Sequence, residues 1–168
     1  EYLSRYTNSP WLIYNRPGEE NDGLFVRDQN GTPQVFDKKL KKILPFTEAS
    51  TDLSFFGDYE FEGHKVIPSF EVLAREYLKK DYHPDNVSSQ IDIESKTIKK
   101  IASELAEVAF EKEIKLQIKW TDWRGVEHDY MIGRPVSMHA MRGISAHSNG
   151  FNTCKLIHIL QVLIGSID

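Results

Sequence analysis

The hydrophobic and polar residues of this chain change their spacing twice, and these changes predict the order of its elements. Residues 1–67 contain short apolar runs separated by turn formers, a pattern typical of β-hairpins and loops. Residues 68–112 have apolar residues three and four positions apart, which indicates helices. Residues 113–168 begin with strict alternation and end with an apolar helix. We therefore expect a mixed α/β segment with a small sheet and about four helices.

Two hairpins are expected in the first part of the chain. Asn30-Gly31 separates the apolar runs Leu24–Val26 and Val35–Phe36, and Asn-Gly is a frequent two-residue turn. A second hairpin turns at Glu62-Gly63 within DYEFEGHKVIPSF. Residues 38–57, KKLKKILPFTEASTDLSFFG, show no clear period and are predicted to form a loop.

Three helices are predicted in the middle of the chain. Pro68 suits the first position of one helix, and Pro84 the start of a short second helix. The clearest helix is ESKTIKKIASELAEVAFEK, for which Ser95 is the expected N-cap. Its apolar stripe consists of Ile98, Ile101, Ala102, Leu105 and Ala109, and its other faces are charged.

The last part begins with an amphipathic hairpin and ends in a strand–loop–helix unit. Apolar and polar residues alternate in IKLQIKW, TDWRG is the expected turn, and VEHDYMI is the expected second strand. One face of this hairpin should therefore be exposed to solvent. Trp120 and Trp123 favour cross-strand aromatic packing over an aromatic platform for a partner. RPVSMHAM is apolar enough to form a buried strand, and Gly165 is the expected stop of the final helix.

The polar loop Arg142–Gly150, between that predicted strand and the final helix, has the chemistry of a phosphate site. A helix N-terminus offers unpaired N–H groups and a positive dipole end, and glycines let a ligand approach closely. Side-chain donors are also available from the loop: Arg142, Ser145, His147, Ser148 and Asn149. The spacing is neither that of G-x-G-x-x-G nor that of a P-loop. The loop is therefore either a ligand site or a helix cap with turn residues.

Composition and charge exclude several classes of function. The 168 residues are 40% hydrophobic and 27% charged, with a formal net charge of −4, so nothing favours a nucleic acid or an acidic membrane as partner. The basic run DKKLKK at Asp37–Lys42 is interpreted as a solvated face. A membrane span and a signal peptide are both missing from the pattern. The single cysteine, Cys154, excludes an internal disulfide and is interpreted as a packed small residue.

No catalytic residue and no metal ligand are predicted. His139 and His147 flank the loop, but no third ligand stands at a usual spacing, which disfavours a metal pair. His147 is better suited to donate to a phosphate, or to make a structural hydrogen bond. His128–Tyr130 is interpreted as surface, and no Ser/His/Asp triad is justified.

The C-terminal stretch GRPVSMHAMRGISAHSNGFNTCKLIHILQVLIGSID resembles part of a known family. It is similar to the catalytic subunit of molybdopterin-guanine-dinucleotide oxidoreductases, the dimethyl sulfoxide reductase superfamily, in which a G-x-x-x-H-x-x-G loop precedes an apolar helix. That loop stands here at Gly143–Gly150. YLSRYTNSPWLI, and the stretch from SFEVL to IASELA, are similar to other parts of the family. The resemblance covers most of the chain and is nearest to the polysulfide, thiosulfate and sulfite branch.

The resemblance implies a fold and a set of cofactor contacts. The segment would belong to the α/β domain that holds one guanine dinucleotide arm of a molybdenum or tungsten cofactor. Its expected cofactor-binding residues are Arg142, Gly143, Ala146, His147, Ser148 and Asn149. The family often has glutamine where Ala146 stands, which leaves only a backbone contact at that position.

The resemblance also implies what the larger enzyme does and with which partners. It would transfer electrons or an oxygen atom to or from a small sulfur compound. An iron–sulfur electron-transfer subunit and a membrane anchor subunit would be its partners, on either face of a bacterial inner membrane. Because the chain starts with Glu and stops after an apolar helix, we expect an internal fragment, inactive and without bound cofactor when isolated. Its exposed apolar faces would favour self-association. The alternative is a stand-alone binding or assembly module without catalysis.

Overall fold

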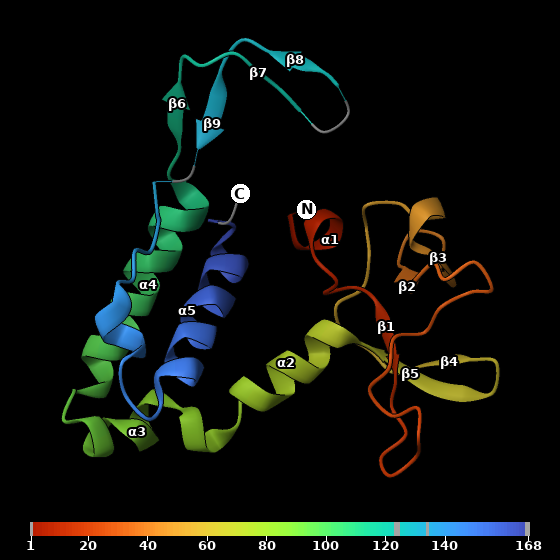
Figure 1. Cartoon of the computed structure of the whole chain (residues 1–168), viewed down its shortest axis with the longest axis horizontal. Coiled ribbons are helices and arrows are strands. Elements are labelled where there is room, and N and C mark those ends of the chain that lie inside the picture. Colours follow the sequence, from red (N-terminus) through yellow and green to blue (C-terminus); the bar gives the residue numbers. More distant parts are fainter. Residues whose placement is uncertain (1, 123–124, 134, 167–168) are drawn as a thin grey trace. The chain divides into compact units, whose positions relative to one another are not determined.

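The computed structural model describes residues 2–122, 125–133 and 135–166, and the chain divides into two compact units, Glu1–Asn86 and Val87–Asp168 (Figure 1). The predicted mixed α and β composition is confirmed. In the described ranges there are five α-helices, of which α1 (Tyr2–Tyr6) is the shortest, together with small antiparallel sheets. Three short 3-10 helices are also present, at η1 (Phe46–Glu48), η2 (Lys80–Tyr82) and η3 (Arg142–Ser145).

The first unit contains a three-stranded antiparallel sheet with the order β1-β5-β4. Its strands are β1 (Leu12–Tyr14), β4 (Tyr59–Phe61) and β5 (His64–Pro68). The hairpin predicted at Glu62-Gly63 is confirmed, because both turn residues have positive φ, 51° and 77°, as a tight two-residue turn requires.

The other predicted hairpin forms only in part. Asp28–Thr32 turns as expected, but Leu24–Val26 forms no strand. Phe25 makes one isolated bridge, to Ile13. The strand β2 (Gln34–Asp37) pairs instead with β3 (Lys42–Pro45). The predicted loop at residues 38–57 is therefore wrong for residues 42–45. A four-residue turn brings Lys42 opposite Asp37, so the backbone groups of both strands become paired whatever the side-chain period.

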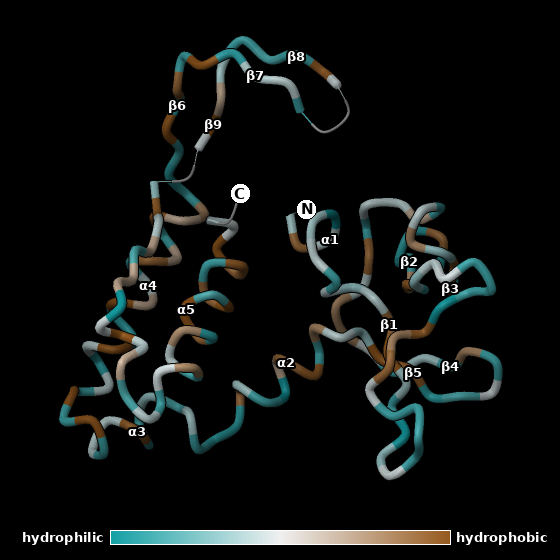
Figure 2. Tube along the Cα trace, viewed as in Figure 1, coloured by the Kyte–Doolittle hydropathy of each residue, from teal (hydrophilic) through white to brown (hydrophobic). Residues whose placement is uncertain are grey.

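The core of the first unit lies where β1, β5 and Leu24–Val26 meet. Leu12, Val26 and Val66 are fully buried there, and Tyr14, Ile43, Tyr59 and Phe61 pack around them. Figure 2 shows hydrophobic residues along β1 and at the end of β5. Burying a side chain of this size contributes roughly 1.5–3 kcal/mol, so these residues decide which face of each strand is inside.

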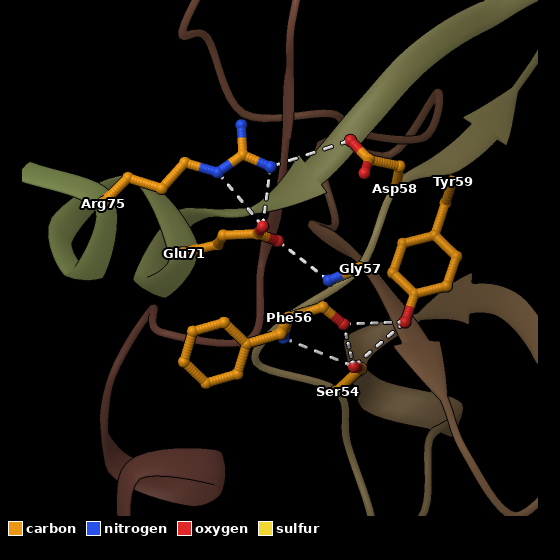
Figure 3. Close-up of polar contacts among 7 residues, drawn as sticks. All are labelled: Ser54, Phe56, Gly57, Asp58, Tyr59, Glu71 and Arg75. Carbon is orange, nitrogen blue, oxygen red and sulfur yellow. Dashed lines mark hydrogen bonds and ion pairs between the residues drawn. The ribbon is translucent and has the colours of Figure 1, made fainter.

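Helix α2 (Ser69–Tyr77) follows β5 directly, with Pro68 as its N-cap. A carboxylate on its first turn holds the preceding loop, as Figure 3 shows: Glu71 Oε2 accepts the backbone N–H of Gly57 at 2.8 Å. Its other oxygen accepts Arg75 Nη2 at 2.6 Å, and Arg75 lies 3.8 Å from Asp58. The helix start and the loop are thereby joined.

The second unit contains the two longest helices. Helix α3 (Pro84–Ile91) contains the boundary between the units and begins at Pro84 as predicted. Helix α4 (Ser95–Glu111) confirms the clearest predicted helix, although its N-cap is Glu94 and Ser95 is its first residue. It packs on α5 (Gly150–Ile164), and Ala109 is its buried residue.

The stripe predicted on α4 is covered only in part. Ile98 and Leu105 are half-buried, whereas Ile101 is 60% exposed. Helix α5 ends as expected, because Gly165 adopts the left-handed conformation, with φ 67° and ψ 34°.

The alternating segment forms a two-part ribbon in the second unit. β6 (Ile114–Leu116) pairs with β9 (Met131–Gly133), and β7 (Trp120–Thr121) pairs with β8 (Glu127–His128). The hairpin is confirmed, and Trp120 stacks on His128 across it with ring centroids 4.8 Å apart. Trp123 lies outside the described residues.

The buried strand predicted from RPVSMHAM is wrong over residues 135–141, which adopt no regular structure and lie partly exposed. Arg134 lies outside the described residues. The physical reason is the lack of a partner: a strand needs a neighbour for its backbone groups, and no described strand pairs with residues 135–141. The loop before α5 therefore follows an irregular segment. Of the expected strand–loop–helix unit, the loop and the helix are present and the strand is not.

Candidate functional site

The second unit has a cleft of about 370 Å³ between the segment before α5 and the side of α5 itself. This volume lies at the lower end of the range of small-molecule sites. The residues that line the cleft are Met138, His139, Ala140, Met141, Arg142, Ile144, Ser145, Cys154, Ile157, His158 and Gln161.

One face of α5 forms the helical wall of the cleft. Its four lining residues, Cys154, Ile157, His158 and Gln161, are separated by three, one and three positions, so they share one side of the helix. Gln161 Nε2 donates to the backbone oxygen of Met138 at 3.2 Å, and this bond ties the opposite wall to the helix. The Gln161 side chain thus fixes the distance between the two walls of the cleft at this end.

The turn between η3 and α5 is tightly packed. Gly150 is buried, and a Cβ atom added there would lie 2.7 Å from the Cα of Ser145, closer than real contacts allow. The N–H of Gly150 donates to the oxygen of His147 at 2.9 Å, and the Ser145 hydroxyl donates to the oxygen of Arg142 at 2.9 Å. A glycine is needed here because two backbones meet, and no unusual φ is involved.

Of the predicted cofactor-binding residues, the structure brings only Arg142 to the cleft. Gly143, Ala146, His147, Ser148 and Asn149 are exposed and do not line it. His147 Nδ1 accepts the backbone N–H of Asn149 at 3.3 Å, so this histidine also has a structural contact. Asn149 is the N-cap of α5, and its side chain makes no capping hydrogen bond.

The electrostatic character of the site is positive. Arg142 carries a fixed positive charge, and the cleft lining contains no Asp or Glu among the described residues. The first turn of α5 has no acidic residue to offset its positive dipole end. An anionic group is therefore the ligand type that this end of the helix favours.

Metal binding has no obvious place in the cleft. In the described ranges no group of three or more His, Cys, Asp or Glu side chains could hold a metal ion. His139 Nε2 lies 3.2 Å from Met141 Sδ, and Cys154 is half-buried in the helical wall. What the lining can do chemically is enclose a flat apolar group between Met, Ile and His side chains and place a charge beside it.

The sequence reasoning missed most of the lining residues. A signal for the helical wall was available, because residues 154, 157, 158 and 161 recur at the i, i+3, i+4, i+7 spacing of one helix face. No such signal existed for Met138 and His139, because their segment has no regular structure.

Comparison with known proteins relates the chain to one curated enzyme. The chain is similar over its whole length to part of a sulfite dehydrogenase subunit from Allochromatium vinosum, with 36% identity over 179 residues. It spans 18% of the length of that protein. No family model and no solved structure matches the chain. None of the helices in the part that the structure describes is long and apolar enough to cross a membrane.

Proposed function

We propose that the chain belongs to the dimethyl sulfoxide reductase superfamily and that residues 138–161 hold part of a molybdopterin guanine dinucleotide. Its similarity along its whole length to part of a sulfite dehydrogenase subunit supports the first part of this proposal. The observation that carries the proposal is the cleft beside Arg142. It lies next to the loop that the family resemblance assigns to the nucleotide.

The residues present fit one nucleotide end of such a cofactor. A cleft of about 370 Å³ has room for a base and its ribose but not for a whole dinucleotide. Ile144, Ile157 and Met141 offer apolar contacts to a flat ring, and Arg142 offers bidentate hydrogen bonds to a phosphate or stacking on the base. The positive dipole end of α5 adds positive potential for a phosphate.

The cofactor would supply the redox chemistry, and the chain's own residues would bind and orient it. We propose that the complete protein is a molybdenum or tungsten oxidoreductase acting on a small sulfur compound. An iron–sulfur subunit and a membrane anchor subunit are the proposed partners. The proposed role of residues 138–161 is to hold one nucleotide arm, with Arg142 beside its phosphate.

Binding of guanosine diphosphate to the full chain tests the proposed role directly. Isothermal titration calorimetry should detect binding, and Arg142→Ala should weaken it about tenfold or more through loss of charge-assisted hydrogen bonds. Lys155→Ala is the matched control, since Lys155 is an exposed cation on α5 that does not line the cleft. Equal affinity of wild type and Arg142→Ala would refute the assignment.

A second measurement tests the redox activity of the complete protein. The coding sequence with its natural flanking regions should yield a protein that contains molybdenum or tungsten and guanine nucleotide, and that oxidises sulfite with an artificial electron acceptor. The same protein with Arg142→Ala should retain less nucleotide per polypeptide. A purified complete protein without metal and without nucleotide would contradict the proposed function.

A further inference from the structure

The turn between β2 and β3 carries an unusual concentration of positive charge that the proposed function does not use. We call residues Lys38–Lys42 the lysine tip: four lysines and Leu40, all exposed. The formal net charge of −4 includes these four charges, so the rest of the chain carries −8. The tip is thus a local positive site on an acidic chain.

The lysine tip is held in one conformation by a buried carboxylate. Asp37 is fully buried; its Oδ1 accepts the N–H of Leu40 at 2.9 Å and its Oδ2 accepts the N–H of Ser50 at 2.7 Å. The N–H of Lys38 donates to the backbone oxygen of Asp52 at 2.9 Å. A partner would therefore meet a preformed backbone, which lowers the ordering cost of binding.

Three of the four lysine charges at the tip are unpaired. Lys38 forms an ion pair with Asp52 at 2.7 Å, whereas Lys39, Lys41 and Lys42 have no acidic partner within the ranges that the structure describes. Lysines on α4 differ in this respect, since Lys96 and Lys100 lie near Glu94 and Glu104. The free ammonium groups at the tip are available to an external anion.

The lysine tip has a left-handed residue at Lys41. Its φ is 53°, in the left-handed region that glycine or asparagine adopts at lower cost than lysine does. The sequence therefore keeps a lysine at a turn position where glycine would be less strained, as it keeps Glu62 at the other hairpin turn.

We propose that the lysine tip is a docking site for a carboxylate-rich surface of another protein, with Leu40 as the apolar contact at its centre. Leu40 is 49% exposed and is flanked on each side by two lysines. A cluster of carboxylates on a partner would touch the tip alone. Acidic residues of the chain more than about 8 Å from that contact would repel it little, because salt screens them at physiological ionic strength.

Other polyanions fit the lysine tip less well. An anionic bilayer is an extended surface that would also approach the acidic remainder of the chain, and a single leucine provides little insertion energy. A nucleic acid is likewise an extended polyanion that would approach the acidic remainder of the chain, and the tip has no aromatic ring for stacking on bases. A partner protein with a local acidic patch avoids both objections.

Binding of a fluorescent octaglutamate peptide to the full chain, followed by anisotropy, tests the proposal. The affinity should fall as salt is raised from about 20 to about 200 mM. The charge reversal K39E/K41E/K42E should weaken binding about tenfold or more. The control K96E/K100E/K119E changes net charge equally at lysines that already have acidic neighbours, and it should change affinity less than about twofold.

A second variant keeps the test decisive if the triple reversal does not fold. Lys41→Gly relieves the left-handed strain and removes one charge, so it should be at least as thermally stable as wild type and still bind the peptide about two- to threefold more weakly. No peptide binding, or equal weakening in the control, would overturn the proposal. So would binding of the tip to phosphatidylserine vesicles without binding to the peptide.

Discussion

Gly150 and Ser145 approach so closely that a methyl group at position 150 would lie 2.6 Å from the carbonyl carbon of Ser145. We expect Gly150→Ala to displace η3 from the start of α5 and to lower the free energy of unfolding by about 1–3 kcal/mol. Urea denaturation followed by circular dichroism measures this.

Gly143→Ala is the matched control for that prediction. A Cβ atom at position 143 would meet no atom within 4 Å, so the free energy of unfolding should change by less than about 0.5 kcal/mol. Similar losses in both variants would show that close approach is not the reason for glycine at position 150.

Asp37 should make the first unit sensitive to acid. Burial raises the pKa of its carboxyl group, but hydrogen bonds from the N–H groups of Leu40 and Ser50 and from neighbouring donors outweigh burial and hold the pKa below its usual value. A pKa that is lower in the folded state stabilises the fold above the unfolded pKa. That stabilisation is lost as the pH falls through the folded pKa.

Asp37→Asn should therefore lower stability at neutral pH by about 1–3 kcal/mol, because one amide cannot accept from both backbone donors. The difference from wild type should shrink as the pH falls below about 4. Asp52→Asn, at a carboxylate that is 57% exposed, should cost less than about 1 kcal/mol. Thermal melts of both proteins between neutral and acid pH measure this difference. A difference in stability between wild type and Asp37→Asn that grew on acidification would contradict the proposed role of the Asp37 carboxylate.

Glu71 should matter more than its position on a helix surface suggests. It is 12% exposed and joins Gly57 to Arg75 (Figure 3). Glu71→Ala leaves the Gly57 N–H without its acceptor and should cost about 1–3 kcal/mol. Glu76→Ala, which removes a half-exposed partner of Lys79, should cost less than about 1 kcal/mol in the same urea titration.

Gln161 should keep the cleft closed at one end. Loss of its hydrogen bond to the Met138 oxygen in Gln161→Ala should raise the open population of residues 138–142 about fivefold, the equivalent of about 1 kcal/mol. Tryptic cleavage after Arg142 should accelerate accordingly. The exposed Gln117→Ala is the control, and equal cleavage rates in all three proteins would refute the role.

The ribbon in the second unit should promote self-association of the chain. Ile114, Leu116 and Ile118 lie at alternate positions and are 44%, 38% and 51% exposed. Replacing Ile114 and Ile118 by Thr should lower the dimer fraction in sedimentation velocity, whereas Lys119→Thr on the other side should not. A strictly monomeric wild type at high concentration would disprove this prediction.

Local signals in the sequence predicted the elements that depend on neighbouring residues. Glu62-Gly63, Pro84 and Gly165 each set the backbone of a turn or helix end within a few residues, and all three were placed correctly. The pairing of β2 with β3 was missed because it depends on the Asp37 hydrogen bonds, which hold a lysine-rich turn that has no apolar period.

The candidate site was predictable only at one end. Arg142 was identified from its charge and its place before an apolar helix, and it lines the cleft. The strand expected before it needed a pairing partner that the sequence pattern does not specify, so residues 135–141 were predicted in the wrong conformation. Whether His147 or Ser148 contacts a cofactor stays a prediction.

All residues that line the cleft lie between residues 138 and 161. Closing such a short length of chain costs little entropy. Pairing β1 with β5 costs more, because it brings Leu12 opposite Pro68 and so closes a longer stretch of chain. We therefore expect the cleft to form early in folding, ahead of the sheet of the first unit, since local contacts form faster than distant ones. Hydrogen-exchange labelling during refolding should then show α5 amides protected before those of β1.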